Sequence, residues 1–443
     1  MKKKAVIISL SFLIISFLLL FNAERYLKNY DYKKVHFYLI DNLSNFINFD
    51  FSSNRLEEIS FEKKKILLEQ FSNNLLRYRF YLAQNKKNIL LISKDGVIFF
   101  ISKQNILNKK KFEIKRIKTN LKELVGRKYV NDYRSIIKGI EIIDENIFVS
   151  YLSNTHGCFS NAIAKGKFSL NAIKFSLLVK LKECKKIFNY SVGGNIVKFK
   201  NNNLLLSTGD FQVPENLEFQ NNKKNKLETD PQNRLSYFGK ILMVNIDTAK
   251  INIISVGHRN PQGLFYDYDE NIIFSTDHGP KGGDEINIDF NPSLKNIKNF
   301  GWPKSSYGVR YEEDINFKDK SCENKILTSL APLCKSHKKF GYLEPVKYFT
   351  PSIGITQLIK FINNKEKNIH VLMVTSMGYH KHEDDMTIHK IDLDSSFSVV
   401  NHEKYYIGER IRDIIQIDDQ NFLLALESAP VPSLGLINFS NYK

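Results

Sequence analysis

The sequence predicts an all-β protein folded as a six-bladed β-propeller. Six times along the chain, a polar turn that ends at or near an asparagine is followed by a short apolar run with strand character. A second short strand precedes each run, so hairpin follows hairpin with little helix between them. The six runs begin at Asn88, Asn146, Asn203, Asn271, Asn368 and Asn421. A β-sandwich or a solenoid would give similar periodicity, and both stay open as alternatives.

The length of 443 residues agrees with one large closed domain. Length alone would suggest two or three domains, but closed all-β architectures routinely exceed that expectation. We therefore expect the propeller to span residues 81–443, with each sheet burying both faces against its neighbours.

Residues 1–23 predict a signal peptide or a signal anchor. Three lysines follow Met1, and an apolar run extends over residues 5–21. No small-x-small cleavage site follows Phe21, which favours an uncleaved anchor over a cleaved signal peptide. In either case the chain leaves the cytoplasm. We expect it in the cell envelope, anchored to the membrane by its N-terminus or periplasmic.

Residues 24–80 predict a helical lead-in or stalk between the anchor and the propeller. Apolar residues recur there at helical spacing among Glu and Lys, which indicates an amphipathic helix. They are Leu56, Ile59, Leu67, Phe71 and Leu75. A helix that binds a partner protein is the alternative.

The formal charge of +18 does not indicate a nucleic-acid-binding protein. Lysines are scattered along the whole chain, and no zinc-finger or RNA-binding signature is present. A solvated basic surface, drawn weakly to anionic lipid, explains the charge. We expect no nucleic-acid partner.

Four cysteines predict disulfide bonds. They have no CxxC spacing, and an even count in an exported chain favours disulfides over a metal site. Sequential pairing, Cys158 with Cys184 and Cys322 with Cys334, is the simplest of three connectivities.

The run Gly-Pro-Lys-Gly-Gly-Asp-Glu at residues 279–285 predicts a loop, since Gly permits positive φ and Pro lacks a backbone donor. Such a loop exposes backbone carbonyls beside two carboxylates, and calcium prefers these hard oxygen ligands. The alternative is a tight turn in which Asp284 and Glu285 only accept hydrogen bonds from backbone amides.

Three blocks carry a resemblance to a known family. They are Gly-His-Arg-Asn-Pro-Gln-Gly-Leu at 257–264, Asp-His-Gly-Pro-Lys-Gly-Gly-Asp-Glu-Ile-Asn at 277–287 and Asn-Phe-Gly-Trp-Pro at 299–303. In this order and spacing they resemble the glucose/sorbosone dehydrogenase family of quinoprotein sugar dehydrogenases. The resemblance implies a six-bladed β-propeller that oxidises an aldose with pyrroloquinoline quinone (PQQ) and calcium.

The resemblance also assigns expected roles to individual residues. The calcium loop would supply Gly279, Pro280, Asp284 and Glu285. Arg259 and Asn260 match an Arg-Asn pair that lies at the quinone. Arg410 and Arg412 resemble a pair that holds the cofactor carboxylates, for which a guanidinium fork is well suited.

Departures from the family pattern bear on catalysis. The family's catalytic His and a nearby Arg correspond to Ser191 and Asn195 in the stretch Ser-Val-Gly-Gly-Asn. A serine hydroxyl cannot accept the sugar proton unaided near neutral pH, whereas an imidazole can. A family Lys corresponds to Gly378. No intact catalytic residue is therefore predicted.

Two functions remain open from the sequence. The first is an envelope quinoprotein that oxidises an aldose. The second is a non-catalytic propeller of the same family that binds a glycan or a protein partner. As partners we expect a sugar or glycan, and the membrane through the N-terminal segment.

Overall fold

The computed structural model of the chain describes residues 52–61, 64–73, 79–108, 114–126, 136–185, 191–211, 230–280, 282–308, 337–361, 369–378, 385–427 and 432–439, with backbone alone for 52–73. The predicted signal segment at 1–23 and the predicted Cys322–Cys334 disulfide lie outside these residues. Among the described residues, no helix is long and apolar enough to cross a membrane.

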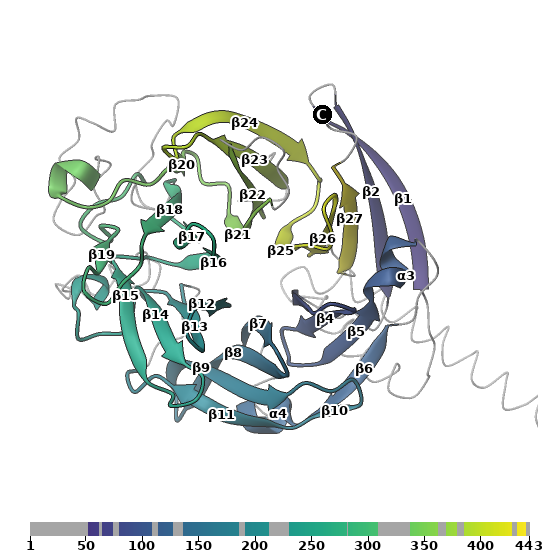
Figure 1. Cartoon of the computed structure of the whole chain (residues 1–443), viewed down its shortest axis with the longest axis horizontal. Helices are drawn as coiled ribbons and strands as arrows, with labels where there is room; N and C mark the ends of the chain where they lie inside the picture. The colour runs from purple at the N-terminus through teal and green to yellow at the C-terminus, as the bar shows by residue number, and fades with distance from the viewer. Residues whose placement is uncertain are drawn as a thin grey trace, which may run out of the picture. The chain divides into compact units, whose positions relative to one another are not determined.

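The described residues form six sheets around a common centre, so the predicted six-bladed β-propeller is confirmed (Figure 1). Each sheet is one blade, and its strands are numbered below from the innermost outward. Blade one contains β3 (Phe80–Gln84), β4 (Asn88–Ser93), β5 (Ile98–Ser102), β6 (Lys115–Thr119) and β10 (Ala172–Ile173). Blade two contains β7 (Ile137–Ile143), β8 (Asn146–Thr155), β9 (Cys158–Lys167) and β11 (Phe175–Lys180).

The next three blades repeat the pattern. Blade three contains β12 (Gly193–Phe199), β13 (Asn203–Thr208), β14 (Lys240–Asn245), β15 (Ile251–Val256) and β19 (Lys298–Asn299). Blade four contains β16 (Pro261–Asp267), β17 (Ile272–Asp277), β18 (Asp284–Phe290) and β20 (Lys347–Phe349). Blade five contains β21 (Ile355–Lys360), β22 (His370–Ser376), β23 (Thr387–Leu393) and β24 (Val399–Tyr406).

Blade six is built from both ends of the described chain. Its inner three strands are β25 (Ile411–Gln416), β26 (Asn421–Leu426) and β27 (Ser433–Asn438). β27 pairs antiparallel with β2 (Lys64–Asn73), which pairs with β1 (Ser52–Phe61). This pairing joins the N-terminal strands to the last blade (Figure 1).

The predicted helical lead-in is wrong for residues 52–73, where the structure has the antiparallel strands β1 and β2. A spacing of four residues, as between Leu67 and Phe71, fits one face of a strand as well as one face of a helix. Pairing with β27 then decides between them, because strand formation depends on tertiary context. The short helices among the described residues are α3 (Lys103–Leu107), α4 (Leu121–Val125), and the 3-10 helices η3 (Asp230–Gln232) and η5 (His337–Phe340).

The six predicted apolar runs form the second strand of each blade. The runs from Asn88, Asn146, Asn203 and Asn421 begin β4, β8, β13 and β26. The run after Asn271 forms β17, and β22 begins at His370, two residues after the predicted start. These strands are almost wholly buried, because blades pack on both of their faces.

The hydrophobic core is divided among the six interfaces between blades. One cluster joins each neighbouring pair, including blades six and one. In the interface between blades four and five, for example, Phe274 and Ile286 pack in the same cluster as Leu372 and Val374. The core therefore holds the blades in a closed ring.

Hydrogen bonds join the inner strands near their starts. Asp413 Oδ2 accepts from the amide of Leu82 at 2.8 Å, which links blades six and one. Asn260 Oδ1 accepts from the amide of Gly193 at 3.1 Å, which links blades four and three. The starts of the inner strands therefore meet at one end of the propeller axis. We call this end the axial face and define it by Arg79, Lys138, Ser191, Arg259 and Arg410, which lie at or next to inner-strand starts.

The predicted Cys158–Cys184 disulfide is confirmed. The two Cα atoms lie 5.4 Å apart, and the bond links the start of β9 to the segment after β11. Backbone hydrogen bonds between Phe159 and Lys185 continue the contact. The two cysteines are 26 residues apart in the sequence, so the bond closes a loop of about that length.

We expect removal of this disulfide to destabilise the fold. In the double variant Cys158→Ser/Cys184→Ser, the free energy of unfolding should fall by about 2–4 kcal/mol, because the unfolded chain regains loop entropy. Denaturant unfolding measures the change, and intact mass with and without reductant counts the disulfides in the wild type. Superimposable unfolding curves for wild type and variant would contradict the expectation.

Candidate functional site

The predicted site residues lie at the starts of inner strands. Ser191 lies two residues before β12, and Arg259 and Asn260 come directly before β16. Arg410 comes directly before β25, and Arg412 is the second residue of that strand. The fold thereby brings residues from blades three, four and six together at the axial face.

A buried hydrogen-bond network fixes the turn that carries Arg259 and Asn260. Asp277 accepts from the amide of Arg259 at 3.1 Å and from that of Asn260 at 2.6 Å. The same carboxylate lies 3.2 Å from His258 Nδ1, and His258 Nε2 lies 2.8 Å from Ser255 Oγ. These distances resemble those of a nucleophilic triad. Ser255 and His258 are, however, 0% exposed, so the network supports the turn and offers no nucleophile to a substrate.

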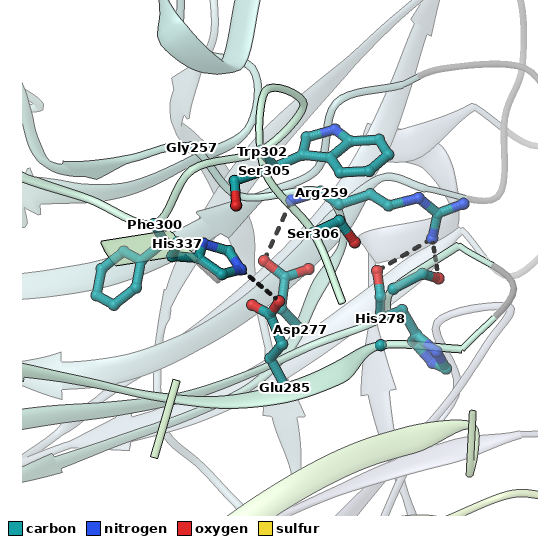
Figure 2. A pocket seen from close by; sticks show the side chains of 12 residues that line it. Gly257, Arg259, Asp277, His278, Glu285, Phe300, Trp302, Ser305, Ser306 and His337 are labelled. Carbon is teal, nitrogen blue, oxygen red and sulfur yellow. Dashed lines mark hydrogen bonds and ion pairs between the residues drawn. The ribbon is translucent and has the colours of Figure 1, made fainter. Parts of the chain in front are cut away.

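The Arg259 side chain lies beside the predicted calcium loop. Its Nη1 donates to the carbonyl oxygen of His278 at 3.0 Å and to that of Gly279 at 2.6 Å. The guanidinium carbon lies 5.5 Å from the centre of the Trp302 ring, within cation–π range. Figure 2 shows Arg259 extended beneath Trp302 toward the backbone at His278, along one side of a small pocket.

Glu285 and His337 form an ion pair on the opposite side of this pocket (Figure 2). His337 Nε2 lies 3.2 Å from Glu285 Oε1, and Asn287 donates to Glu285 Oε2 at 3.3 Å. Burial raises the pKa of Glu285, although the contact with His337 opposes the shift. His337 was not predicted from the sequence, because it lies far along the chain from the loop and belongs to none of the three blocks.

Asp284 is saturated by hydrogen bonds from the backbone. Its Oδ1 accepts from the amide of Gly279 at 3.0 Å, and its Oδ2 accepts from the amides of Ile353 and Ile355 at 3.1 and 3.0 Å. Burial alone would raise the pKa of Asp284, but His278 and the amides hold it below its usual value. Asp284 therefore stays ionised and joins the loop to the start of blade five.

The four residues predicted to bind calcium have other partners in this structure. Asp284 and Glu285 accept the hydrogen bonds just described, and the Gly279 carbonyl accepts from Arg259. The Pro280 carbonyl accepts from Ser352 Oγ at 3.2 Å. Within the described residues, no group of three or more His, Cys, Asp or Glu side chains is arranged to hold a metal ion. These hydrogen bonds match the amide-binding turn that the sequence left open as the alternative.

The second predicted pair, Arg410 and Arg412, meets at one buried carboxylate. Arg412 Nε pairs with Glu427 Oε1, and Arg410 Nε lies 3.7 Å from Glu427 Oε2. Arg79, which no sequence motif indicated, lies 3.3 Å from Glu427 Oε1. Burial alone would raise the pKa of Glu427, but Arg412, Arg79 and Arg410 together lower it. One ionised carboxylate therefore binds three guanidinium groups.

Lys138 adds a fourth positive charge to this region. It is the second residue of the inner strand β7 and is half-buried. Burial, Arg79 and Arg412 lower the pKa of Lys138 to about 7. Arg79, Lys138 and Glu427 lie outside the recognised motifs. Their position at the inner-strand starts and at the end of β26 is the signal that could have revealed them.

Ser191 and Asn195 are structural in this fold. Ser191 is buried, and its carbonyl oxygen accepts from the amide of Phe211 at 2.9 Å. Asn195 Nδ2 donates across the blade interface to the carbonyl oxygen of Gln262 at 2.9 Å. The carbonyl oxygen of Gly378, at the position of the family Lys, accepts from Arg410 Nη1 at 3.2 Å. None of the three offers a base on the axial face.

The fold and the site define a closed six-bladed β-propeller with a cationic axial face. The family described as Glucose / Sorbosone dehydrogenase matches residues 142–431 of the 443. This chain belongs to that family.

The chain is also similar to several known proteins. Uncharacterized protein slr1608 of Synechocystis sp. is 26% identical over 259 residues, which cover 53% of this chain and 56% of the relative. Aldose sugar dehydrogenase YliI of Escherichia coli is 31% identical over 117 residues, 26% of each chain. A crystal structure of glucose dehydrogenase superimposes with a TM-score of 0.59 at 18% identity, covering 81% of this chain and 96% of its own. The chain thus spans about half the length of the first relative and a quarter of the second.

We expect Asp284 to stabilise the fold independently of calcium. Asp284→Ala should lower the free energy of unfolding by about 3 kcal/mol, because two buried amides and one part-buried amide would lose their acceptor. The exposed Asp269→Ala should change it by at most about 0.5 kcal/mol. Melting of the wild type should be the same in calcium and in a chelator. If chelation lowered the melting temperature of the wild type but not that of Asp284→Ala, the result would support a calcium site at this loop.

Proposed function

We propose that the axial face binds the carboxylates of PQQ through Arg410 and Arg412, and that the chain oxidises neutral aldoses weakly or not at all. The observation that carries the first half is the excess of guanidinium groups around Glu427. Three arginines share one carboxylate there, so positive charge is left to bind an anion. A guanidinium can give a carboxylate two parallel charge-assisted hydrogen bonds.

The residues present fit a cofactor that carries several carboxylates. Arg410 is only part-buried, with a side-chain exposed fraction of 33%, so it can turn toward a ligand on the axial face. Arg412 is buried and pairs with Glu427, which fixes its position. PQQ, when bound, would supply the two-electron redox chemistry, while the protein orients cofactor and sugar.

The second half of the proposal follows from the missing base. A positioned general base contributes about 100- to 10,000-fold to such a reaction. The residue at the family's His position, Ser191, is buried and has a hydroxyl that does not ionise near neutral pH. His258 is buried within the Asp277 network and is no substitute. We therefore infer that binding persists while turnover is slow.

A second candidate function is that of a non-catalytic propeller that binds a glycan or a protein partner. The hydrogen bonds within the predicted calcium loop favour this second candidate. Arg259 donates to the Gly279 carbonyl oxygen, and backbone amides donate to the Asp284 carboxylate. This candidate keeps the ligand site on the axial face and removes the redox step. Cofactor titration separates the two.

The site of action that we propose is the cell envelope. The Cys158–Cys184 disulfide is of a kind that persists in oxidising compartments. The basic and apolar residues 1–23 would export the chain and anchor it to the membrane. Fractionation of cells, with mass analysis of the N-terminus, tests both the location and the cleavage.

PQQ binding and aldose oxidation should separate in this protein. We expect calorimetric titration of the full chain to show PQQ binding, and Arg410→Gln to weaken it about 10- to 100-fold through loss of charge-assisted hydrogen bonds. The exposed Arg116→Gln should leave the affinity unchanged. With PQQ and calcium added, glucose oxidation should stay at or near the background rate. No PQQ binding would favour the second candidate, and fast oxidation would show that another residue is the base.

A further inference from the structure

Two outer strands of the propeller carry basic residues and no acidic ones. β6, the last long strand of blade one, has three basic side chains, and β11, the outer strand of blade two, has three in or beside it. No Asp or Glu occurs in residues 115–119 or 172–182. All six basic side chains are exposed, and we call this set the basic rim: Lys115, Arg116, Lys118, Lys174, Lys180 and Lys182.

The outer strands of the other blades differ in charge. β15 of blade three has no charged residue, and β20 of blade four has one lysine. β24 of blade five has Glu403 beside Lys404. β1 of blade six has Glu57 and Glu58 as well as Arg55. The net charge of +18 is therefore spread unevenly over the described outer strands, and its concentration on blades one and two indicates a partner of opposite charge.

The two halves of the basic rim belong to one continuous surface. β10 pairs in parallel with β6, with Ala172 opposite Lys118. Asn120, directly after β6, accepts from the amide of Phe175 at 2.7 Å and donates to its carbonyl oxygen at 3.0 Å. Figure 1 shows β6, β10 and β11 along one arc of the outer edge of the ring, with α4 beside them. The edge of blade one therefore continues directly into that of blade two.

Carboxylates next to these strands do not neutralise the basic rim. Asp95 pairs with Lys122 of α4 at 2.8 Å. Glu183, which follows the last lysine of the rim, accepts from Ser236 Oγ at 2.8 Å. Glu123 is the one exposed carboxylate of α4. The basic rim therefore keeps an excess of positive charge toward solution.

An exposed leucine lies within the basic rim. Leu177 of β11 has an exposed fraction of 49%, although Phe175 on the same strand is buried. The lysines around it add apolar stems with charged ends. Apolar side chains among lysines are typical of surfaces that rest on an anionic bilayer, where the leucine enters the boundary between headgroups and acyl chains. Charge alone would suit any polyanion, and Leu177 favours a lipid surface.

We propose that the basic rim docks the propeller on the surface of an anionic lipid bilayer. Its cations contact the lipid phosphate groups, and Leu177 contacts the acyl boundary. This contact is additional to the predicted membrane segment at residues 1–23, and it requires neither that segment nor PQQ. The axial face lies at one end of the propeller axis and away from the outer strands, so docking leaves the proposed ligand site open to solution.

Vesicle binding of the full chain tests the proposal. We expect the chain to bind vesicles of equal parts phosphatidylglycerol and phosphatidylcholine at least about tenfold more tightly than vesicles of phosphatidylcholine alone. High salt should remove the difference, because it screens exposed charges. Residues 1–23 are the same in every sample, so the ratio of the two affinities reports the charge-dependent contact.

Paired variants locate that contact. Lys118→Gln/Lys180→Gln should lower the affinity for the anionic vesicles about 10- to 30-fold, because each basic residue near an anionic surface contributes about fivefold. Lys295→Gln/Lys404→Gln removes the same charge from exposed positions elsewhere on the propeller and should leave the affinity within about twofold. An equal loss in both pairs would show that net charge alone drives binding, which overturns the basic rim as a docking surface.

Chemical labelling of lysine amines gives a readout that does not depend on the total affinity. With the full chain bound to either kind of vesicle, Lys118, Lys174 and Lys180 should react at least about threefold more slowly on the anionic vesicles. The exposed Lys295 and Lys404 should react alike on both. Mass analysis of the labelled peptides measures each rate. Equal rates for all five lysines on both kinds of vesicle would overturn the proposal, even where residues 1–23 insert into both.

Two other roles of an exposed basic strand give different results, and either result would overturn the proposal. Lysines on an edge strand also prevent pairing with another chain. That role alone predicts oligomers of Lys118→Gln/Lys180→Gln in size-exclusion chromatography and no lipid preference of the wild type. A surface for a polyanion would bind duplex DNA as tightly as the anionic vesicles and would not respond to Leu177→Ser. We expect Leu177→Ser to weaken vesicle binding about threefold with an unchanged melting temperature.

Discussion

The pairing of β2 with β27 is the constraint on which the rest of this molecule depends. A ring of sheets keeps both faces of every blade buried only while the last blade stays in contact with the first. Here β25 to β27 come from the C-terminal end of the described chain, and β1 and β2 come from its N-terminal end. The same closure brings Arg79, shortly after β2, to Glu427, between β26 and β27. Closing the ring therefore also assembles the cationic cluster.

The fold was more predictable from the sequence than the site, for a physical reason. The strand runs are local patterns set by burial on both faces, and all six appear as second strands of blades. The segment 52–73 was mispredicted because its spacing fits either a helix or a strand, and only pairing with β27 decides. Arg410 and Arg412 were found through a local motif. Arg79 and Lys138 were missed, since only ring closure brings them near.

The calcium loop shows how one motif permits two structures. A Gly-rich turn that ends in two carboxylates can offer oxygens to a cation or accept hydrogen bonds from amides. In this fold Asp284 accepts hydrogen bonds from two amides at the start of blade five, and the Arg259 guanidinium donates to the Gly279 carbonyl oxygen. Composition could not decide between these outcomes, because the deciding partners, Arg259 and the residues around Gly354, lie elsewhere in the sequence.

We propose that positive charge without a base separates binding from turnover in this member of the family. The cations of the axial face are costly to keep together without anions, since burial and like charge both act against them. Their number exceeds what Glu427 can neutralise, so a bound anion would add compensating charge and stabilise the fold. Ser191, at the family's His position, is by contrast buried, and its carbonyl oxygen accepts a hydrogen bond from the amide of Phe211. The charges suit recognition of an acidic ligand, and they do so whether or not the ligand is oxidised afterward.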